Sequence, residues 1–314
     1  MVAKCIYQAV QVVVELLEDV VVYPSTIEKT GITTKRRHFS CSLLQGCVDM
    51  HDTLLSLVER ALTGNSRPLE FYLRDHSRLP GPRANLELAN DVSSLLASFV
   101  PKYPENVHTL INQFANGDRK MVSSNTPDEF IMLCGIIAFG TCAAAYSPWR
   151  EESFEMLEHY ACSAHWRVRE GVAIAYQHLL TTVPYETIDR LVNLATTGNY
   201  LQQRATIAAV AEPPLLYDPD LLAAALKIQR IVLERFRDAP KFDRKTEDLR
   251  TLRRTLGYTI SVITVALPEQ GFALMRECAS WNDADITWVL RENLKKKRLA
   301  KFVEDTEALS KMLA

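Results

Sequence analysis

The sequence predicts an all-α protein whose helical hairpins stack into an α-α superhelix, that is, an α-solenoid. The composition is globular and poor in loop-forming residues, with 47% hydrophobic residues, 24% charged residues and only 11 glycines in 314 residues. Helical periodicity and helix-start signals recur along most of the chain. One local pattern also repeats in the second half, as expected of a repeat architecture.

The repeated pattern is an arginine about one turn into a predicted helix, with an apolar residue nearby on the same face. Its arginines are Arg169, Arg204, Arg254 and Arg291, separated by 35, 50 and 37 residues. Two of these intervals suit a helical hairpin of roughly 40 residues, the unit of several α-solenoids. We expect the longer interval to contain an insertion around 238–243.

Residues 1–147 are predicted to form a helical N-terminal part, made of divergent hairpins or a cap. Irregular loops are expected at about 25–40, which is polar, and 63–83, which contains three prolines and permits only a short helix. The helix over 127–145 is almost wholly apolar and is therefore expected to be buried. Gly135 and Gly140 in it are expected to allow close packing. The helices expected in this part cover 3–22, 42–62, 84–100, 104–115 and 127–145.

Residues 148–314 are predicted to form the repeats, because here the helices fall into pairs. The first helix of several pairs is preceded by proline or begins with it, where the missing N–H has no cost. The expected pairs are 150–162 with 165–180, 184–196 with 200–211, 220–237 with 245–265, and 268–279 with 283–298.

Charge and cysteine content indicate a soluble, cytoplasmic protein. The formal charge is −2, whereas a general nucleic-acid binder would be basic; residues 239–301 nevertheless carry 13 Lys and Arg against 8 Asp and Glu, a local excess of +5. Seven scattered cysteines, without a secretory leader, suggest reduced thiols. The valine-rich segment 12–22 is interrupted by acidic residues and is too short to span a bilayer, so no membrane association is expected.

The second half resembles the HEAT-repeat family, of the bacterial and archaeal kind with short, degenerate repeats. The resemblance extends over about 148–302. In that family an acidic residue opens the second helix of a hairpin and an arginine joins a ladder between repeats, which implies a pair between Asp283 or Asp285 and Arg291. The residues that carry the resemblance are Trp166-Arg167-Val168-Arg169-Glu170, 200–207 and 283–296.

Aromatic and arginine side chains at helical spacing form the candidate binding surface. Trp166 with Arg169, and Trp288 with Arg291, are neighbours at i and i+3, and could stack or grip an anion or a base. The alternative, which we favour, is that the aromatics fill hairpin cores and the arginines bind carbonyls or carboxylates between repeats. The complete candidate set is Trp166, Arg169, Tyr200, Arg204, Trp288, Arg291, Lys295 and Lys296.

The run 295–298 could contact phosphate, although basic residues at a helix end more often stay solvated and complement the helix dipole. The segment 286–292 also resembles, more distantly, the carboxy-terminal repeat of the DNA alkylation-repair glycosylases. That resemblance implies aromatic residues and a carboxylate on a concave face that hold DNA.

No catalytic or metal site is expected. The chain has no nucleophile elbow, phosphate-binding glycine loop or His-Glu-x-x-His sequence, and no cofactor is predicted. His159, Cys162 and His165 have a spacing compatible with zinc but lack an evident fourth ligand. We therefore predict a non-catalytic scaffold that binds a protein partner on a curved surface. The alternative is a DNA-binding or DNA-repair module, and the oligomeric state stays open.

Overall fold

The structure, a computed structural model, describes residues 42–116 and 122–313. The chain divides into two compact units, Met1–Gly46 and Cys47–Ala314. Every described helix lies wholly in the second unit except α2, which begins in the first. The predicted helix over 3–22 and the predicted loop at 25–40 lie outside the described residues.

The described residues form fourteen α-helices and four short 3-10 helices, and they contain no strand, which confirms the all-α prediction for them. The α-helices are α2 (Ser42–Leu62), α3 (Arg67–Asp75), α4 (Leu86–Phe99), α5 (Pro104–Asn116), α6 (Pro127–Ala145), α7 (Arg150–Tyr160), α8 (Trp166–Thr182), α9 (Pro184–Thr197), α10 (Tyr200–Val210), α11 (Pro219–Arg237), α12 (Glu247–Ala266), α13 (Pro268–Ala279), α14 (Ala284–Leu294) and α15 (Val303–Met312). The 3-10 helices are η1 (Ser147–Trp149), η2 (Pro213–Tyr217), η3 (Asp243–Lys245) and η4 (Lys297–Leu299).

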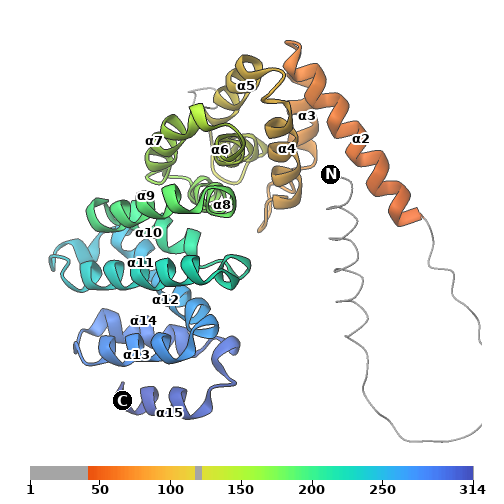
Figure 1. Cartoon of the computed structure of the whole chain (residues 1–314). Helices are drawn as coiled ribbons and strands as arrows, with labels where there is room; N and C mark the ends of the chain where they lie inside the picture. Colours follow the sequence, from red (N-terminus) through yellow and green to blue (C-terminus); the bar gives the residue numbers. More distant parts are fainter. Residues whose placement is uncertain (1–41, 117–121, 314) are drawn as a thin grey trace, which may run out of the picture. The chain divides into compact units, whose positions relative to one another are not determined.

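Most helices from α6 onward pack in two rows (Figure 1). In one row α6, α8, α10, α12 and α14 each contact the next helix of the row. In the other row α9, α11, α13 and α15 do the same, and the short loops join the rows into hairpins. Because each hairpin covers the apolar face of its neighbour, one hydrophobic core runs through the described residues.

The helix starts follow the sequence signals. α9, α11 and α13 begin at Pro184, Pro219 and Pro268, as the proline pattern predicts. The side chain of Asn199 accepts hydrogen bonds from the backbone N–H groups of Leu201 and Gln202 and completes a capping box at α10. The second helix of the hairpin is therefore positioned by residues at its first turn.

Helix α6 is the buried centre of the first half. It contacts α3, α4, α5, α7 and α8, and most of its residues are inaccessible to solvent. Within the described residues it alone is long and apolar enough to cross a membrane, yet most of it is buried inside the protein, as in the core helix of a soluble protein. A Cβ on Gly140 would lie 2.4 Å from the backbone oxygen of Ala175, so the glycine permits the close approach of α8.

The segment 63–83, predicted to be irregular with only a short helix, contains the nine-residue helix α3, whose Leu69 and Leu73 are fully buried. Pro68 lies in the first turn of α3, where it does not interrupt the helix. Residues 303–312 form α15, a helix that was not among the predicted ones. Its Leu309 is buried and Asp305 forms an ion pair with Arg276 of α13 at 2.8 Å.

The domain boundary predicted at residue 147 stays a prediction. Packing continues across that position, because α6 contacts α7 and α8 directly. The 3-10 helix η1 lies at the boundary and contacts both α6 and α7.

Candidate functional site

Two of the repeated arginines bind backbone carbonyl groups near the start of α8. Arg169 Nη1 donates to the carbonyl oxygens of Ser163, at 2.6 Å, and Ala164, at 3.2 Å. Arg204 Nη1, on α10, donates to the carbonyl oxygen of Arg169 at 2.6 Å and so joins successive helices of the row. Here the arginines act between and within hairpins, as the favoured alternative expects.

The other two repeated arginines have different partners. Arg254 forms an exposed ion pair with Glu247 of its own helix, at 2.6 Å. Arg291 Nη2 donates to the carbonyl oxygen of Leu313, at the end of α15. The four instances of the pattern therefore do not make one common contact.

The tryptophans of the pattern stack on arginines other than the predicted ones. The guanidinium over the Trp166 ring belongs to Arg167, with Cζ 4.4 Å from the ring centroid. The guanidinium over Trp288 belongs to Arg253 of α12, at 4.1 Å. Arg169 and Arg291 bind carbonyl groups instead, so sequence spacing on one helix does not identify the stacking partner.

The ion pair implied by the HEAT-type resemblance is also formed by other arginines. Asp283 caps α14 by accepting from the N–H groups of Asp285 and Ile286. It pairs with Arg244 at 2.8 Å, and Asp285 pairs with Arg244 at 2.9 Å and with Arg253 at 3.1 Å. The links thus run from the start of α14 to η3 and α12 rather than to Arg291.

The remaining candidate residues lie apart. The Tyr200 hydroxyl donates to Asp243 at 2.7 Å, and burial together with this contact raises the pKa of Tyr200 to about 12. Lys295 forms an ion pair with Glu292 on the same helix, at 2.5 Å. Lys296 is half-buried and precedes η4. Tyr200 therefore pairs with a carboxylate rather than with Arg204.

The structure brings Trp166 and Arg169 together in an open pocket of about 600 Å³, here called the Trp166 pocket. Trp166 is 45% exposed, so its indole is available to a ligand, whereas Trp288 is half-buried and packs against the core. The pocket lies where α8, α10 and α12 begin, and its wall consists of Cys162, Ser163, Ala164, Trp166, Arg169, Asn199, Leu201, Glu247, Asp248 and Thr251.

Two of the three charged residues that line the Trp166 pocket, Glu247 and Asp248, are acidic, and the third is Arg169. The Arg169 guanidinium is held by two carbonyl groups, and Glu247 is paired with Arg254. Asp248, in the first turn of α12, is exposed and has neither a hydrogen bond nor an ion pair with any described residue. The pocket therefore presents an exposed indole that also stacks on Arg167, and a carboxylate that has no ion pair but whose charge interacts with Arg169.

Burial shifts the pKa values of three charged side chains on α8 and α10. Desolvation lowers the pKa of Arg169, and the neighbouring charge of Arg204 lowers it further. Desolvation also lowers the pKa of Arg204 and raises that of Glu170. These three groups lie on one stretch of α8 and α10, whose charges are poorly solvated and hence costly to leave without partners.

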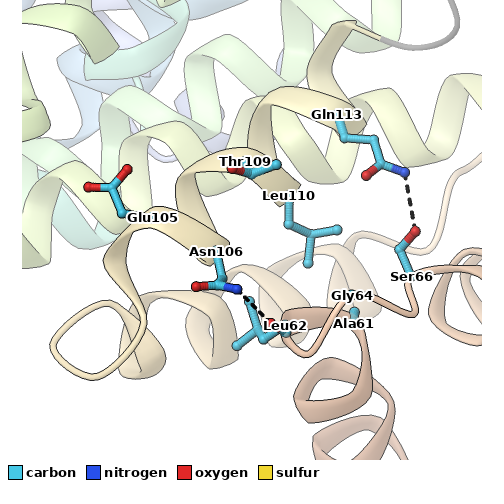
Figure 2. A pocket seen from close by; sticks show the side chains of 9 residues that line it. All are labelled: Ala61, Leu62, Gly64, Ser66, Glu105, Asn106, Thr109, Leu110 and Gln113. Atoms are coloured by element: carbon cyan, nitrogen blue, oxygen red, sulfur yellow. Dashed lines mark hydrogen bonds between the residues drawn. The ribbon is translucent and has the colours of Figure 1, made fainter.

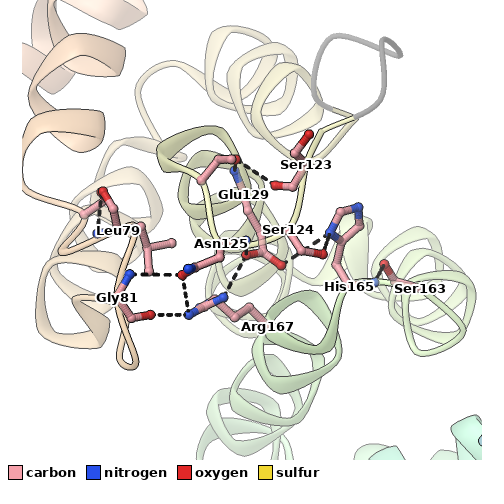
Figure 3. A network of polar contacts seen from close by, with 11 residues as sticks. Leu79, Gly81, Ser123, Ser124, Asn125, Glu129, Ser163, His165 and Arg167 are labelled. Atoms are coloured by element: carbon pink, nitrogen blue, oxygen red, sulfur yellow. Dashed lines mark hydrogen bonds and ion pairs between the residues drawn. The ribbon is translucent and has the colours of Figure 1, made fainter.

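A buried ion pair links the start of α8 to the start of α6 (Figure 3). Arg167 is 3% exposed and its Nη1 lies 3.0 Å from Oε2 of Glu129, a side chain with no exposed surface. Arg167 Nη2 donates to the carbonyl oxygen of Gly81 at 2.7 Å and to Asn125 Oδ1 at 3.1 Å. Since Arg167 also stacks on Trp166, this network orients the indole that lines the pocket.

This network is only partly visible in the sequence. Glu129 occupies the third position of α6 after the capping residue Thr126, and its carboxylate accepts from the N–H of Asn125 at 2.7 Å. The order Thr, two residues, Glu is the signal of a capping box and was available in the sequence. Its pairing with Arg167, 38 positions further along the chain, was not.

The three residues weighed as metal ligands have separate partners. Cys162 Sγ accepts from the Asn199 amide at 3.2 Å. His165 Nδ1 lies 3.1 Å from Ser124 Oγ and 3.3 Å from Glu129 Oε1. His159 packs its ring edge against Tyr160. No group of three or more His, Cys, Asp or Glu residues suited to a metal ion occurs among the described residues.

A smaller pocket, of about 220 Å³, lies between the end of α2 and α5 (Figure 2). Two of its polar side chains are engaged: Asn106 donates to the carbonyl oxygen of Leu62 at 2.9 Å, and Gln113 donates to Ser66 at 3.2 Å. These contacts join α2 to α5. The Trp166 pocket is larger and contains an exposed aromatic side chain, so it is the better candidate for a binding site.

No protein-family model matches the chain, and no curated protein matches it.

Proposed function

We propose that the protein is a non-catalytic, cytoplasmic α-solenoid of the HEAT type that binds a segment of a partner protein in the Trp166 pocket. The two rows of helices support this architecture, because stacked hairpins of this kind provide extended binding surfaces. The observation that carries the proposal is that the exposed Trp166 indole and the exposed Asp248 carboxylate line one pocket.

The chemistry of the pocket favours a cationic side chain from the partner. A lysine or arginine over an indole gains cation–π attraction of about 0.5–2 kcal/mol. Asp248 supplies the opposite charge, and the Arg169 guanidinium, which keeps its own positive charge and interacts with Asp248, is held by carbonyl groups. The buried Arg167 contacts hold Trp166 in place before binding, which reduces the entropy lost on association.

The protein proposal is tested with an array of peptides about twelve residues long, in which a single lysine or arginine is placed at each position or omitted. We expect binding to require the cationic residue and to weaken about tenfold in Trp166→Ala and in Asp248→Asn, the loss of one cation–π or charge contact. Tyr185→Ala is the matched control, since Tyr185 is an exposed aromatic residue on α9, in the other row. Equal binding by all variants, or no dependence on the cationic residue, would overturn the proposal.

A second candidate function is binding of DNA, as in the alkylation-repair glycosylases. The observation in its favour is that an exposed tryptophan and an aspartate, Trp166 and Asp248, share one pocket. Glu247 beside Asp248 would repel the phosphate backbone, and for that reason we prefer the protein partner.

The two candidates are separated with a labelled DNA duplex titrated over a range of salt. The DNA hypothesis expects an affinity that falls steeply as salt rises, because each neutralised phosphate releases counterions, and that weakens in Lys296→Glu. The protein hypothesis expects no binding of the duplex even at low salt. If the protein binds the duplex and none of the peptides, the DNA hypothesis replaces the protein hypothesis.

A further inference from the structure

A third pocket, of about 390 Å³, lies at the opposite end of α12 from the Trp166 pocket. Its wall is apolar except for one arginine, and consists of Pro213, Leu216, Tyr217, Val262, Val265, Ala266 and Arg298. Tyr217, on η2, is 89% exposed. Apolar walls with one polar group at the edge are the usual composition of a site that accepts a large apolar side chain.

The charge at the edge of this pocket is free and positive. Arg298 has neither a hydrogen bond nor an ion pair with any described residue, and the adjacent Lys297 is likewise exposed and unpaired within that part of the chain. Both belong to η4, the basic run that follows α14. A ligand that fills the apolar pocket therefore places its next group beside cations, which favours a carboxylate.

One face of α12 connects the two pockets. Thr251 lines the Trp166 pocket, while Val262 and Val265 line the apolar one. The spacings 251, 258, 262 and 265 place these residues on one helical face, and Tyr258 between them is exposed. At 1.5 Å per residue the two ends are about 21 Å apart, a distance that about six or seven residues of extended chain can cover.

We propose that the apolar pocket is a second subsite that binds a large apolar side chain next to a carboxylate, in the same partner segment whose cationic residue enters the Trp166 pocket. The link between the subsites rests on the proposed function, but the chemistry of the apolar pocket does not. The partner is thus an extended segment with a basic residue at one end and an acidic, leucine- or phenylalanine-containing stretch at the other.

Three peptide probes test this subsite by fluorescence anisotropy. The first carries a lysine among glycines and serines, the second a leucine between glutamates, and the third joins both through a flexible spacer of about fifteen residues, whose r.m.s. length matches the separation of about 21 Å. We expect the second probe to bind and the joined probe to bind about a hundredfold more tightly than either, because the linked event has a high effective concentration.

Variants assign the binding to the pocket. Tyr217→Ala and Arg298→Glu change exposed side chains. Each is expected to lower the affinity for the acidic probe about tenfold and to leave the affinity for the lysine probe unchanged. Arg250→Glu is the matched control, a charge reversal at an exposed position of α12 that lines neither pocket. The proposed subsite would be overturned if the acidic probe did not bind, or if its affinity were unchanged in Tyr217→Ala and Arg298→Glu.

The remaining outcomes separate the two proposals. If only the acidic probe binds, the subsite stands and the proposed function of the Trp166 pocket fails; if only the lysine probe binds, the reverse holds. A joined probe no tighter than the acidic probe overturns the shared segment. Arg298-dependent sedimentation with vesicles of anionic lipid, without binding of the acidic probe, would replace the peptide by a membrane surface and overturn the proposal.

Discussion

Replacing Arg167 by alanine is expected to lower the free energy of unfolding by about 3–5 kcal/mol, because it leaves Glu129 charged and without its main partner in the protein interior. The carbonyl oxygen of Gly81 and the amide of Asn125 lose a donor at the same time. The measurement is urea unfolding followed by circular dichroism.

Arg254→Ala is the matched control for Arg167→Ala. Its ion pair with Glu247 is exposed, with side chains 62% and 64% accessible, and loss of such a pair is expected to change stability by less than about 1 kcal/mol. The double variant Glu129→Gln, Arg167→Met is expected to recover part of the loss, because no buried charge remains. Similar stability of Arg167→Ala and Arg254→Ala would show that the network in Figure 3 does not hold α8 to α6.

Gly140→Ala is expected to destabilise the protein by about 1–3 kcal/mol, the range for overpacking a close-packed interior. The added Cβ would lie 2.4 Å from the oxygen and 2.6 Å from the Cα of Ala175, and these backbone atoms of α8 cannot move without displacing the helix. The higher helix propensity of alanine, worth about 1 kcal/mol, is too small to compensate. Thermal unfolding followed by circular dichroism measures the change.

Gly257→Ala controls for the propensity term, since it makes the same substitution inside another helix, α12. There the nearest neighbours of an added Cβ are the Cβ of Glu292, at 3.3 Å, and a ring atom of Trp288, at 3.4 Å, so a shift of a few tenths of an ångström relieves the contact and no backbone atom is overlapped. Its stability is expected to stay close to that of the unchanged protein. A Gly140→Ala variant that melts no lower than Gly257→Ala would contradict the close contact between α6 and α8.

Local patterns predicted much of the secondary structure. The prolines that open α9, α11 and α13 and the apolar run of α6 act within one helix turn or one helix face, so they can be recognised without knowing the fold. α15 was missed because neither a proline nor a capping side chain marks its start. Its buried Leu309 has meaning only once α13 lies beside it.

The candidate site was predicted in part. Trp166 and Arg169 do line one pocket, but Tyr200, Trp288 and Arg291 have partners elsewhere. Glu247 and Asp248, the acidic wall of the pocket, were not singled out, since they lie about eighty residues further along the chain. No spacing within a single helix brings such positions together.

From the sequence alone the protein is determined to be helical, with α6 as a buried helix and with prolines and capping residues at the starts of its hairpins. Propensity, periodicity and capping depend on neighbours a few residues away, and these are present in the chain itself. Tertiary structure decided which arginine stacks on which tryptophan, which carboxylate Arg167 neutralises, and which side chains stay free beside Trp166. Ion pairs and stacking depend on distances of a few ångströms between residues far apart in sequence, and only the packing of the helices sets those distances.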